Sequence, residues 1–364
     1  MKERPSTMKP DVRNWRDIDA EYLNSILAMN GFDAKIAHVE KSPVGTGQVG
    51  DCVRFALEYQ TETPDAPRSM VGKFPADAED SRKAGVEFGI YKREVKFYQQ
   101  LQPKARITTP DCYFADIDEE THEFILLMSD AAPAIQGDQI EGVSLSEMKT
   151  IIKEAAKLHS AFWMDETLDD LSWMEETPQT KAVFDPATMP GVWALFLDLY
   201  GDRLSTSAKH LGEAVSGNFA KFRSLKSEKQ CLLHADFRPD NMLFASPEGG
   251  KPLSVVDWQS VSCGPAATDV GYCVAGALSP EIRRQHEAEL LDLYASELEK
   301  LGAGPYDMEK LKAHYVLGAY QLFQTAFHSS TFVERTARGD EMFLKMVNGA
   351  VDLIHDHKAE DWFD

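Results

Sequence analysis

The stretch Cys231–Phe244, CLLHADFRPDNMLF, decides how the rest of the chain is interpreted. Apolar runs at its two ends have the composition of short buried strands. Between them stand His234, Asp236 and Asn241, in the pattern His-x-Asp-x-x-x-x-Asn. This spacing suits a tight loop in which a carboxylate and a carboxamide converge on one small volume. A carboxylate can orient a hydroxyl and accept its proton, and an amide oxygen can bind Mg²⁺. A polar turn without catalytic function fits the same residues.

The next strand-like segment ends in a second carboxylate. Asp257 follows the apolar run PLSVV. An acid that terminates a buried strand is costly unless it is paired or bound to a metal. The alternative is an ordinary turn carboxylate at the end of a strand.

Glycines cluster far upstream, where Gly45, Thr46, Gly47, Gln48 and Gly50 form a G-x-G-x-x-G pattern. Glycines let a backbone approach phosphates closely and adopt positive φ. A dinucleotide site requires a helix after this pattern. Here a strand is expected on both sides, which favours a hairpin that covers phosphates. An ordinary glycine-rich hairpin is the alternative.

Two further charged residues complete the set. Lys73 lies within the apolar strand MVGKFP, where an ammonium group needs a partner or an anionic ligand. Glu94 follows in Gly85–Leu101, which has the spacing of a single helix, and it is a candidate partner for Lys73. The alternatives are a lysine on an exposed strand edge and a glutamate on a solvated helix face.

The periodicity changes once along the chain. Strand patterns with one long helix dominate up to about Asp130, and helical patterns dominate afterwards. Ser144 or Ser146 is expected to cap the first helix of this second part, and Ser144 and Glu147 have the spacing of a capping box. We therefore expect an α+β protein with an N-terminal antiparallel sheet plus helix and a mainly helical C-terminal part.

Composition excludes several classes of partner. The 364 residues carry a net charge of −21, which repels nucleic acids and anionic membranes. The five cysteines are scattered and form no C-x-x-C, which is typical of reduced thiols in a cytoplasm. No apolar run is long enough to cross a bilayer, and no secretory signal is evident. The sequence predicts a cytoplasmic protein.

The full set of features, in this order, resembles the protein-kinase-like superfamily. Within it, HADFRPDN and VVDWQSVSCGPAATDVGY resemble the aminoglycoside phosphotransferase and choline/ecdysteroid kinase-like branch, from about Val44 to about Tyr294. The resemblance implies a two-lobed fold, with an ATP-binding lobe over residues 1–129 and a catalytic, acceptor-binding lobe over 130–364. It also implies an enzyme that uses ATP and Mg²⁺ to phosphorylate a hydroxyl of a small molecule.

In the N-terminal lobe, the resemblance implies that the Gly45–Gly50 loop covers the ATP phosphates. Lys73 would contact the α- and β-phosphates and would be held by Glu94. The adenine would contact backbone groups of Met128, Ser129 and Asp130.

In the C-terminal lobe, Asp236 matches the residue that receives the proton of the acceptor, and Asn241 and Asp257 match the Mg²⁺ ligands. Arg238 lies where many protein kinases have a lysine that touches the γ-phosphate, although an arginine pointing into solvent fits as well. His234 is expected to brace the loop.

Asp269 resembles the downstream aspartate that fixes the catalytic loop. Only eleven residues separate Asp257 from Asp269, which leaves no room for a long activation segment. Asp257-Trp258-Gln259 also replaces the usual Asp-Phe-Gly. The short interval favours a small-molecule acceptor over a protein, and the missing glycine argues against regulation through an activation loop.

Aromatic and methionine side chains in segments without a protein-kinase counterpart favour a bulky, partly apolar acceptor. These side chains are Trp163, Trp173, Met174, Trp193, Phe196, Tyr200, Tyr320, Phe323 and Phe327. Many of them are expected to be core residues. An aminoglycoside- or choline-type cation is the alternative acceptor, and it would require clustered acids such as those within His355–Asp364, which an acidic frayed tail also explains. A catalytically silent nucleotide-binding pseudokinase is the alternative outside the enzymes.

Overall fold

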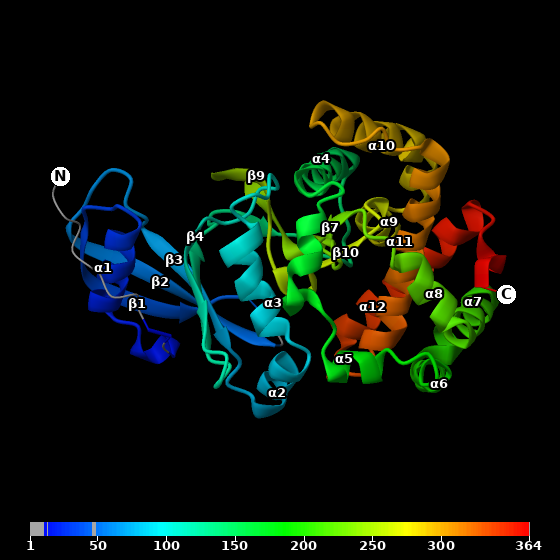
Figure 1. The fold of residues 1–364 in the computed structure, drawn as a ribbon, viewed down its shortest axis with the longest axis horizontal. Helices are drawn as coiled ribbons and strands as arrows, with labels where there is room; N and C mark the ends of the chain where they lie inside the picture. Colours follow the sequence, from blue (N-terminus) through cyan, green and yellow to red (C-terminus); the bar gives the residue numbers. More distant parts are fainter. Residues whose placement is uncertain (1–10, 13, 46–48, 364) are drawn as a thin grey trace. The chain divides into compact units, whose positions relative to one another are not determined.

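The structure is a computed structural model that describes residues 11–12, 14–45 and 49–363 (Figure 1). The chain divides into two compact units. The N-terminal unit extends to Pro103 and includes Thr109–Ala132, and the C-terminal unit contains Lys104–Thr108 and Pro133–Asp364. Lys104–Thr108 joins the C-terminal unit because Thr108 donates its N–H to Glu154 and accepts from the N–H of Val255.

The N-terminal unit is built on a five-stranded antiparallel sheet with the order β1-β2-β3-β5-β4 (Figure 1). Its strands are β1 Lys35–Pro43, β2 Gly50–Thr61, β3 Ser69–Pro75, β4 Cys112–Ile117 and β5 Phe124–Ser129. In β2, Val53, Phe55 and Leu57 alternate with more exposed residues, which is the pattern of a sheet with one buried face. The helix α1 Ala20–Met29 buries Leu23 and Ile26 in one hydrophobic core with these three β2 residues.

The helix expected over Gly85–Leu101 is interrupted, so that prediction was wrong. Two helices, α2 Glu79–Glu87 and α3 Ile90–Lys96, are separated at Gly89, and a π-helical turn follows α3. Gly89 has φ of 67°, a left-handed conformation that glycine adopts without steric cost. Glu94 keeps a helical position in α3.

The C-terminal unit is mainly helical (Figure 1). Its helices are α4 Leu145–Ala161, α5 Pro178–Val183, α6 Met189–Tyr200, α7 Thr206–Gly217, α8 Phe219–Lys226, α9 Ala267–Ala277, α10 Pro280–Lys300, α11 Met308–Ser329 and α12 Ala337–Asp356. The capping box predicted at the start of α4 is present, with Ser144 and Glu147 bonded reciprocally. The predicted α+β fold class is confirmed.

Short strands in the C-terminal unit frame the candidate loop. They are β6 Ile135–Gln136, β7 Cys231–Leu233, β8 Met242–Ser246, β9 Gly249–Val255 and β10 Ser262–Gly264. The strand β7 pairs with β10, and β8 lies between β6 and β9. The loop from His234 to Asn241 therefore leaves one small sheet and enters another.

Two close-packed helices lie behind this loop. A side chain at Gly271 of α9 would overlap the backbone of Tyr315 in α11, and one at Gly318 of α11 would overlap Thr268 of α9. Glycine is required at both positions because the two helix backbones touch. This contact fixes α9 and α11 against each other.

The C-terminal segment after α12 is packed rather than frayed. Phe363 is fully buried, and Asn218 donates a hydrogen bond to its carbonyl oxygen over 2.6 Å. Tyr320 donates to the carbonyl oxygen of Ala359 over 2.5 Å. Within the part of the chain that the structure describes, no helix has both the length and the apolar character to cross a membrane.

Candidate active site

The 234–241 loop begins with a strained residue that one carboxylate holds in place. Ala235 has φ of 63°, a left-handed conformation that costs an L-residue about 1–2 kcal/mol. Asp269, in α9, accepts the N–H of His234 on Oδ2 over 2.7 Å and the N–H of Ala235 on Oδ1 over 3.0 Å. These two bonds stabilise the turn that presents the next residue, Asp236.

Asp269 is itself supported by a buried histidine. His159 Nε2 lies 3.3 Å from Asp269 Oδ2, and His159 Nδ1 lies 2.6 Å from the hydroxyl of Tyr294. An ionised carboxylate only accepts, so Nε2 carries the proton and Nδ1 accepts from Tyr294. Tyr294 thereby sets the tautomer of His159 that donates to Asp269.

Three side chains converge on the carboxylate of Asp236. Tyr272 donates to Oδ1 over 2.9 Å, Asn241 Nδ2 to Oδ2 over 2.8 Å, and Arg238 Nε to both oxygens over 3.1 and 3.2 Å. Burial alone would raise the pKa of Asp236, but the charge of Arg238 and the hydrogen bonds from Tyr272 and Asn241 outweigh it and lower that pKa. Asp236 is therefore held as an oriented carboxylate.

Arg238 bridges two acids instead of extending into solvent. Its side chain is 20% exposed, and its second bond runs from NH1 to Asp240 Oδ2 over 2.5 Å. Asp240 in turn accepts from Arg338 of α12 over 3.1 Å, and Arg338 also pairs with Asp138. Alternating charges thus link Asp236 to the start of α12.

Asn241 and Asp257 provide oxygen atoms on neighbouring segments. The side-chain amide nitrogen of Asn241 donates to Asp236, so the side-chain amide oxygen points away from Asp236. The backbone N–H of Val256 donates to the backbone carbonyl oxygen of Asn241 over 3.0 Å. Asp257 follows β9 in a left-handed conformation with φ of 68°. Amide and carboxylate oxygens are the donors that Mg²⁺ prefers, so the donor set fits this ion.

A metal at this position would depend on the nucleotide for further ligands. Among residues 11–12, 14–45 and 49–363, no group of three or more His, Cys, Asp or Glu side chains is placed to hold a metal ion. Mg²⁺ commonly binds one or two protein oxygens together with substrate phosphates and water. Asn241 and Asp257 match that pattern.

His234 lies inside the C-terminal unit as a bracing residue. It is fully buried, and its Nε2 lies 3.0 Å from the carbonyl oxygen of Val256. Because a carbonyl only accepts, Nε2 carries the proton, and Nδ1 accepts the N–H of Asp236 over 3.3 Å. His234 therefore connects the loop to the segment that carries Asp257.

The N-terminal unit brings Lys73 and Glu94 together. Lys73 Nζ lies 2.7 Å from Glu94 Oε2, and the two side chains are 14% and 3% exposed. Gly50 is next to them, since a Cβ there would lie 3.4 Å from Lys73 Cε and 3.0 Å from the carbonyl oxygen of Phe74. The third glycine of the motif thus leaves room for the lysine side chain.

Gly45 and Gly50 are the glycines of the G-x-G-x-x-G pattern that lie within the described part of the chain. Gly45 has φ of 77°, as a turn residue would, and Thr46, Gly47 and Gln48 lie outside the described residues. A pocket of about 240 Å³ includes Gly45 and Gly50, but Asp51 and Asp77 also line it. Two carboxylates disfavour phosphate binding in this pocket.

The segment expected to contact adenine ends the strand β5. Met128 pairs with Val71 of β3, and Ser129 exchanges hydrogen bonds with Asp111. The carboxylate of Asp130 accepts from Arg54 over 2.6 Å and from Ser69 over 2.7 Å. The carboxylate of Asp130 therefore already has cationic and hydroxyl partners within the N-terminal unit.

Two residues of the site were not predicted. Tyr272 ends the quoted motif VVDWQSVSCGPAATDVGY, three positions after Asp269, and this helical spacing places both on one face of α9. Asp240, next to Asn241, anchors Arg238 by accepting a hydrogen bond from its guanidinium group. The helical spacing from Asp269 could have indicated Tyr272. No such local pattern indicates Asp240, because its partner Arg338 lies 98 residues away in the sequence.

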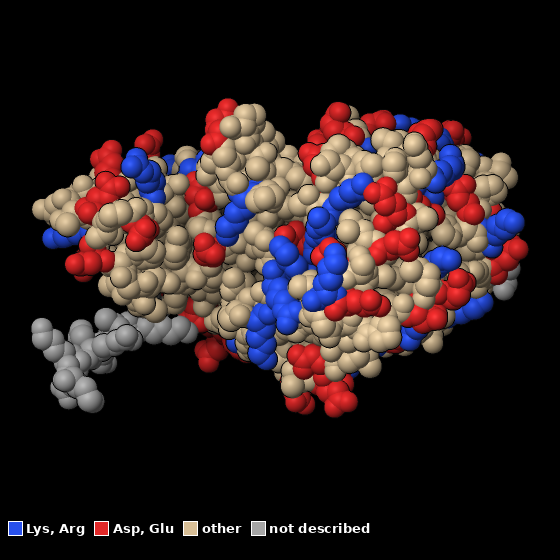
Figure 2. All heavy atoms as spheres, turned by 90° about the horizontal axis from the view of Figure 1, so that it is seen from above, with Lys and Arg blue, Asp and Glu red and all other residues tan. Residues whose placement is uncertain are grey.

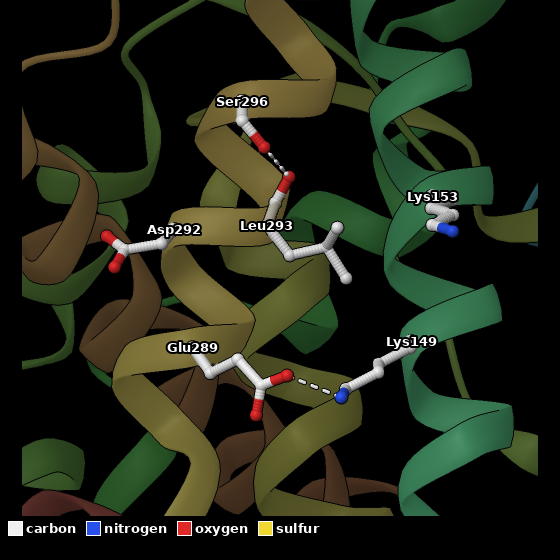
Figure 3. Close-up of a pocket in the computed structure, with 6 residues that line it drawn as sticks. All are labelled: Lys149, Lys153, Glu289, Asp292, Leu293 and Ser296. Atoms are coloured by element: carbon white, nitrogen blue, oxygen red, sulfur yellow. Dashed lines mark hydrogen bonds and ion pairs between the residues drawn. The ribbon is translucent and has the colours of Figure 1, made fainter.

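A separate surface pocket of about 420 Å³ lies between α4 and α10 (Figure 3). Its lining residues are Lys149, Lys153, Glu289, Asp292, Leu293 and Ser296. The ion pair between Lys149 and Glu289 spans the two helices, and no residue of the predicted site lines this pocket.

In Figure 2, basic side chains gather near the middle of one face while acidic ones are spread across it. The net negative charge is therefore unevenly distributed.

Solved structures identify the class of fold. An ethanolamine kinase of Plasmodium vivax matches over 85% of this chain and 81% of its own, with a TM-score of 0.50 and 12% identity. An ADP-bound aminoglycoside phosphotransferase matches over 92% and 98%, with a TM-score of 0.45 and 15% identity. A microcompartment-associated aminopropanol kinase matches over 94% and 99%, with a TM-score of 0.47 and 12% identity. The likeness to the ethanolamine kinase is one of fold, and it places this chain in the two-lobed, protein-kinase-like class of folds.

The family follows from the sequence itself. The model of the ecdysteroid kinase-like family matches residues 45–303, which is more than half of the chain. The protein belongs to the ecdysteroid kinase-like family. This confirms the predicted superfamily, and the predicted kinase class of enzyme is confirmed at the level of the family. A comparison with curated proteins found no significant match.

Proposed function

We propose that this protein transfers the γ-phosphoryl group of ATP, with Mg²⁺, to a hydroxyl of a small molecule. The observation that carries the proposal is the carboxylate of Asp236, which Tyr272, Asn241 and Arg238 orient and keep ionised. A carboxylate fixed in this way accepts a hydrogen bond from the acceptor hydroxyl and aligns its oxygen for attack on phosphorus. It takes up the hydroxyl proton as the acceptor oxygen bonds to the γ-phosphorus and the bond from that phosphorus to the β–γ bridging oxygen breaks, which releases ADP.

The other site residues handle the negative charge of the nucleotide. Lys73, held by Glu94, offsets charge on the α- and β-phosphates. Asn241 and Asp257 would hold Mg²⁺, which would supply positive charge to offset that of the phosphates. We assign nucleotide binding to residues 1–129 and catalysis and acceptor binding to residues 130–364. The left-handed turn at Ala235 and the bonds to Asp269 place Asp236 before any ligand arrives.

The acceptor is proposed to be bulky, partly apolar and without a high positive charge. Two of the acids near the C-terminus already have partners within the fold: Asp356 forms ion pairs with Arg283 and Arg284, and Glu360 contacts His355. Such paired acids are poor ligands for a polycation, which disfavours an aminoglycoside- or choline-type acceptor. The ecdysteroid kinase-like family name also points to a hydroxylated, largely apolar acceptor.

Aromatic side chains supply less of the acceptor site than their number suggests. Six of the nine aromatic and methionine residues considered are core residues, namely Trp193, Phe196, Tyr200, Tyr320, Phe323 and Phe327. Trp163, Trp173 and Met174 are half-buried and can contact a ligand. These three, rather than the α11 aromatics, are the candidates for acceptor contacts.

A cytoplasmic location is part of the proposal. Cys231 and Cys273 are buried and form no disulfide. Buried, unlinked cysteines fit a reducing compartment. ATP at the concentrations that a kinase requires is available there.

The test is product detection by mass spectrometry after incubation with Mg-ATP and a mixed library of hydroxylated compounds. We expect an acceptor to gain one phosphoryl group, about 80 Da, and Asp236→Asn to abolish the product while retaining nucleotide binding. Asp292→Asn, an exposed acid of α10, is the matched control. Saturable Mg-ATP binding with a product that survives Asp236→Asn would contradict the assigned role of Asp236.

The same library decides between the alternatives. Phosphorylation confined to polycationic sugars or choline would replace the acceptor class proposed here. Nucleotide binding without any product across both groups of compounds would favour a silent pseudokinase. The retention of Lys73, Glu94, Asp236, Asn241 and Asp257 argues against that outcome.

A further inference from the structure

The peptide that leads into Asp236 is held from two different helices. Asp269 of α9 accepts the N–H of Ala235 over 3.0 Å. Gln321 of α11 donates from Nε2 to the carbonyl oxygen of the same residue over 3.2 Å. That carbonyl belongs to the peptide bond between Ala235 and Asp236. Both polar groups of the left-handed residue are therefore bonded to side chains of the helix pair behind the loop.

The environment of Gln321 indicates that the side chain is not present for stability. Gln321 is 7% exposed, and its Oε1 is buried without a hydrogen-bond partner among the described residues. Burying an amide oxygen without a donor lowers stability, and an apolar side chain of the same size avoids this cost. The bond to Ala235 is the interaction that a methionine or leucine at this position would not provide.

The two anchoring helices cannot shift relative to each other without clashes. Gly271 and Gly318 allow the backbones of α9 and α11 to touch, next to the turns that carry Asp269 and Gln321. Because the backbones are in contact, the two side chains keep a fixed separation. A residue held between them has little freedom to rotate.

We propose that Gln321 is a positioning residue for Asp236, acting through the Ala235 carbonyl. It fixes the rotation of the Ala235–Asp236 peptide and thus the direction from which the Asp236 carboxylate meets the acceptor hydroxyl. This inference rests on the proposed phosphotransferase function. Gln321 itself touches neither the reacting atoms nor the carboxylate. Loss of its bond lowers the fraction of molecules with Asp236 aligned, so the maximal rate falls while substrate binding is preserved.

Three variants of the full-length protein test this role. Gln321→Met keeps the volume and removes the donor. Gln321→Glu keeps the shape and removes the donor only while the carboxyl is ionised. Gln324→Met is the matched control, because Gln324 lies on the same helix, is 5% exposed and makes no hydrogen bond to the 234–241 loop within the described residues.

The expected result for Gln321→Met is a roughly tenfold lower kcat, KM values within about twofold of wild type, and an unchanged or higher Tm. Gln321→Glu should match Gln321→Met at alkaline pH and recover activity as the pH falls, because a protonated carboxyl donates again. A purely structural role predicts a lower Tm and no recovery. Wild-type kcat in Gln321→Met, or an equal loss in Gln324→Met, would overturn the proposal.

Hydrogen exchange provides a readout that does not need an acceptor. Exchange of peptides covering Cys231–Phe244 should be faster in Gln321→Met than in wild type and unchanged in Gln324→Met. If wild-type protein shows no phosphotransfer, the proposed function fails. The exchange measurement still reports whether Gln321 restrains the Ala235–Asp236 peptide. Unchanged exchange in both variants would show that Gln321 does not restrain the loop, whatever the activity of the enzyme.

Discussion

The hydroxyl of Tyr272 donates a hydrogen bond to Oδ1 of Asp236 over 2.9 Å. The tyrosine comes from α9, the same helix that supplies Asp269, so one helix both shapes the loop and orients its carboxylate. Burial and the neighbouring Asp236 charge raise the pKa of Tyr272, so its proton stays on the hydroxyl at neutral pH. Asp236 is consequently the proton acceptor of this pair.

Tyr272→Phe should lower kcat by about tenfold, since a hydrogen bond to a charged group contributes roughly 1.5–3 kcal/mol. The bond from Tyr272 is one of the interactions that lower the pKa of Asp236, so its removal raises that pKa. Activity requires the carboxylate and is lost as the pH falls through this pKa. The acidic limb of the kcat profile should therefore move to higher pH in Tyr272→Phe.

Tyr320→Phe is the control for this variant. Tyr320 is fully buried in α11, and its hydroxyl donates to the Ala359 carbonyl, away from Asp236. It should lose stability without moving the acidic limb. An unshifted limb in Tyr272→Phe would show that Tyr272 does not contribute to the ionisation of Asp236.

Lys73→Met should weaken Mg-ATP binding by at least tenfold and also lower stability. The substitution leaves Glu94, 3% exposed, without its cationic partner, and breaking a buried ion pair in this way costs about 3–5 kcal/mol. Calorimetry with a non-hydrolysable ATP analogue and urea unfolding measure the two effects separately.

The double variant Lys73→Met with Glu94→Gln separates binding from folding. Neutralising Glu94 removes the uncompensated charge, so most of the stability should return while nucleotide binding stays weak. Lys92→Met is the control, because Lys92 pairs with Glu119 at the surface, where such a pair contributes less than about 1 kcal/mol. Recovery of nucleotide binding in the double variant would contradict a direct role for Lys73.

Asp269→Asn should destabilise the 234–241 loop. The carboxylate accepts N–H groups on both oxygens, from His234 and from Ala235, and an amide places its NH₂ against one of them. We expect a loss of about 1–3 kcal/mol in unfolding free energy and at least a tenfold lower kcat. Urea unfolding and steady-state kinetics measure these, with the exposed Asp292→Asn as the comparison. A variant with full activity would show that the loop does not need Asp269.

Local patterns were sufficient to predict the elements that carry the site. Alternation in β2 and the capping box at Ser144 depend on neighbouring residues, and the structure shows both, together with the antiparallel pairing of β1 and β2 on either side of the glycine-rich loop. The single helix over Gly85–Leu101 was wrong because Gly89 adopts positive φ, and a glycine within a helical pattern does not reveal which conformation it takes.

The contacts that orient the site depend on residues far apart in the sequence. Gln321 lies 86 positions from Ala235, and Tyr294 lies 135 positions from His159. No period or motif links such pairs, because the packing of α4 against α10 and of α11 against the 234–241 loop brings them together. The candidate charged residues could be named from their motifs, whereas the hydrogen bonds that orient them could not.

The buried side chain of His328 should make the free energy of unfolding sensitive to acid. Its ring stacks on Phe184 at 4.2 Å and lies 4.7 Å from the ring of Phe332. Burial lowers the pKa of His328 to about 4, whereas an unfolded chain has the ordinary value of 6.5. The unfolded state thus takes up a proton first, so stability is complete above about pH 6.5 and declines as the pH falls towards 4. The decline amounts to at most about 3 kcal/mol.

His328→Phe keeps an aromatic ring in the stack and removes the titrating group. Urea unfolding at several pH values between 7.5 and 4.5 should show that wild type loses stability relative to His328→Phe as the pH falls, with the difference growing mainly below pH 6.5. His38→Gln, on the exposed face of β1, should leave the wild-type pH dependence in place. A constant difference between wild type and His328→Phe across this range would mean that His328 takes up its proton equally well in the folded protein, and the buried ring would then have to be accessible to water.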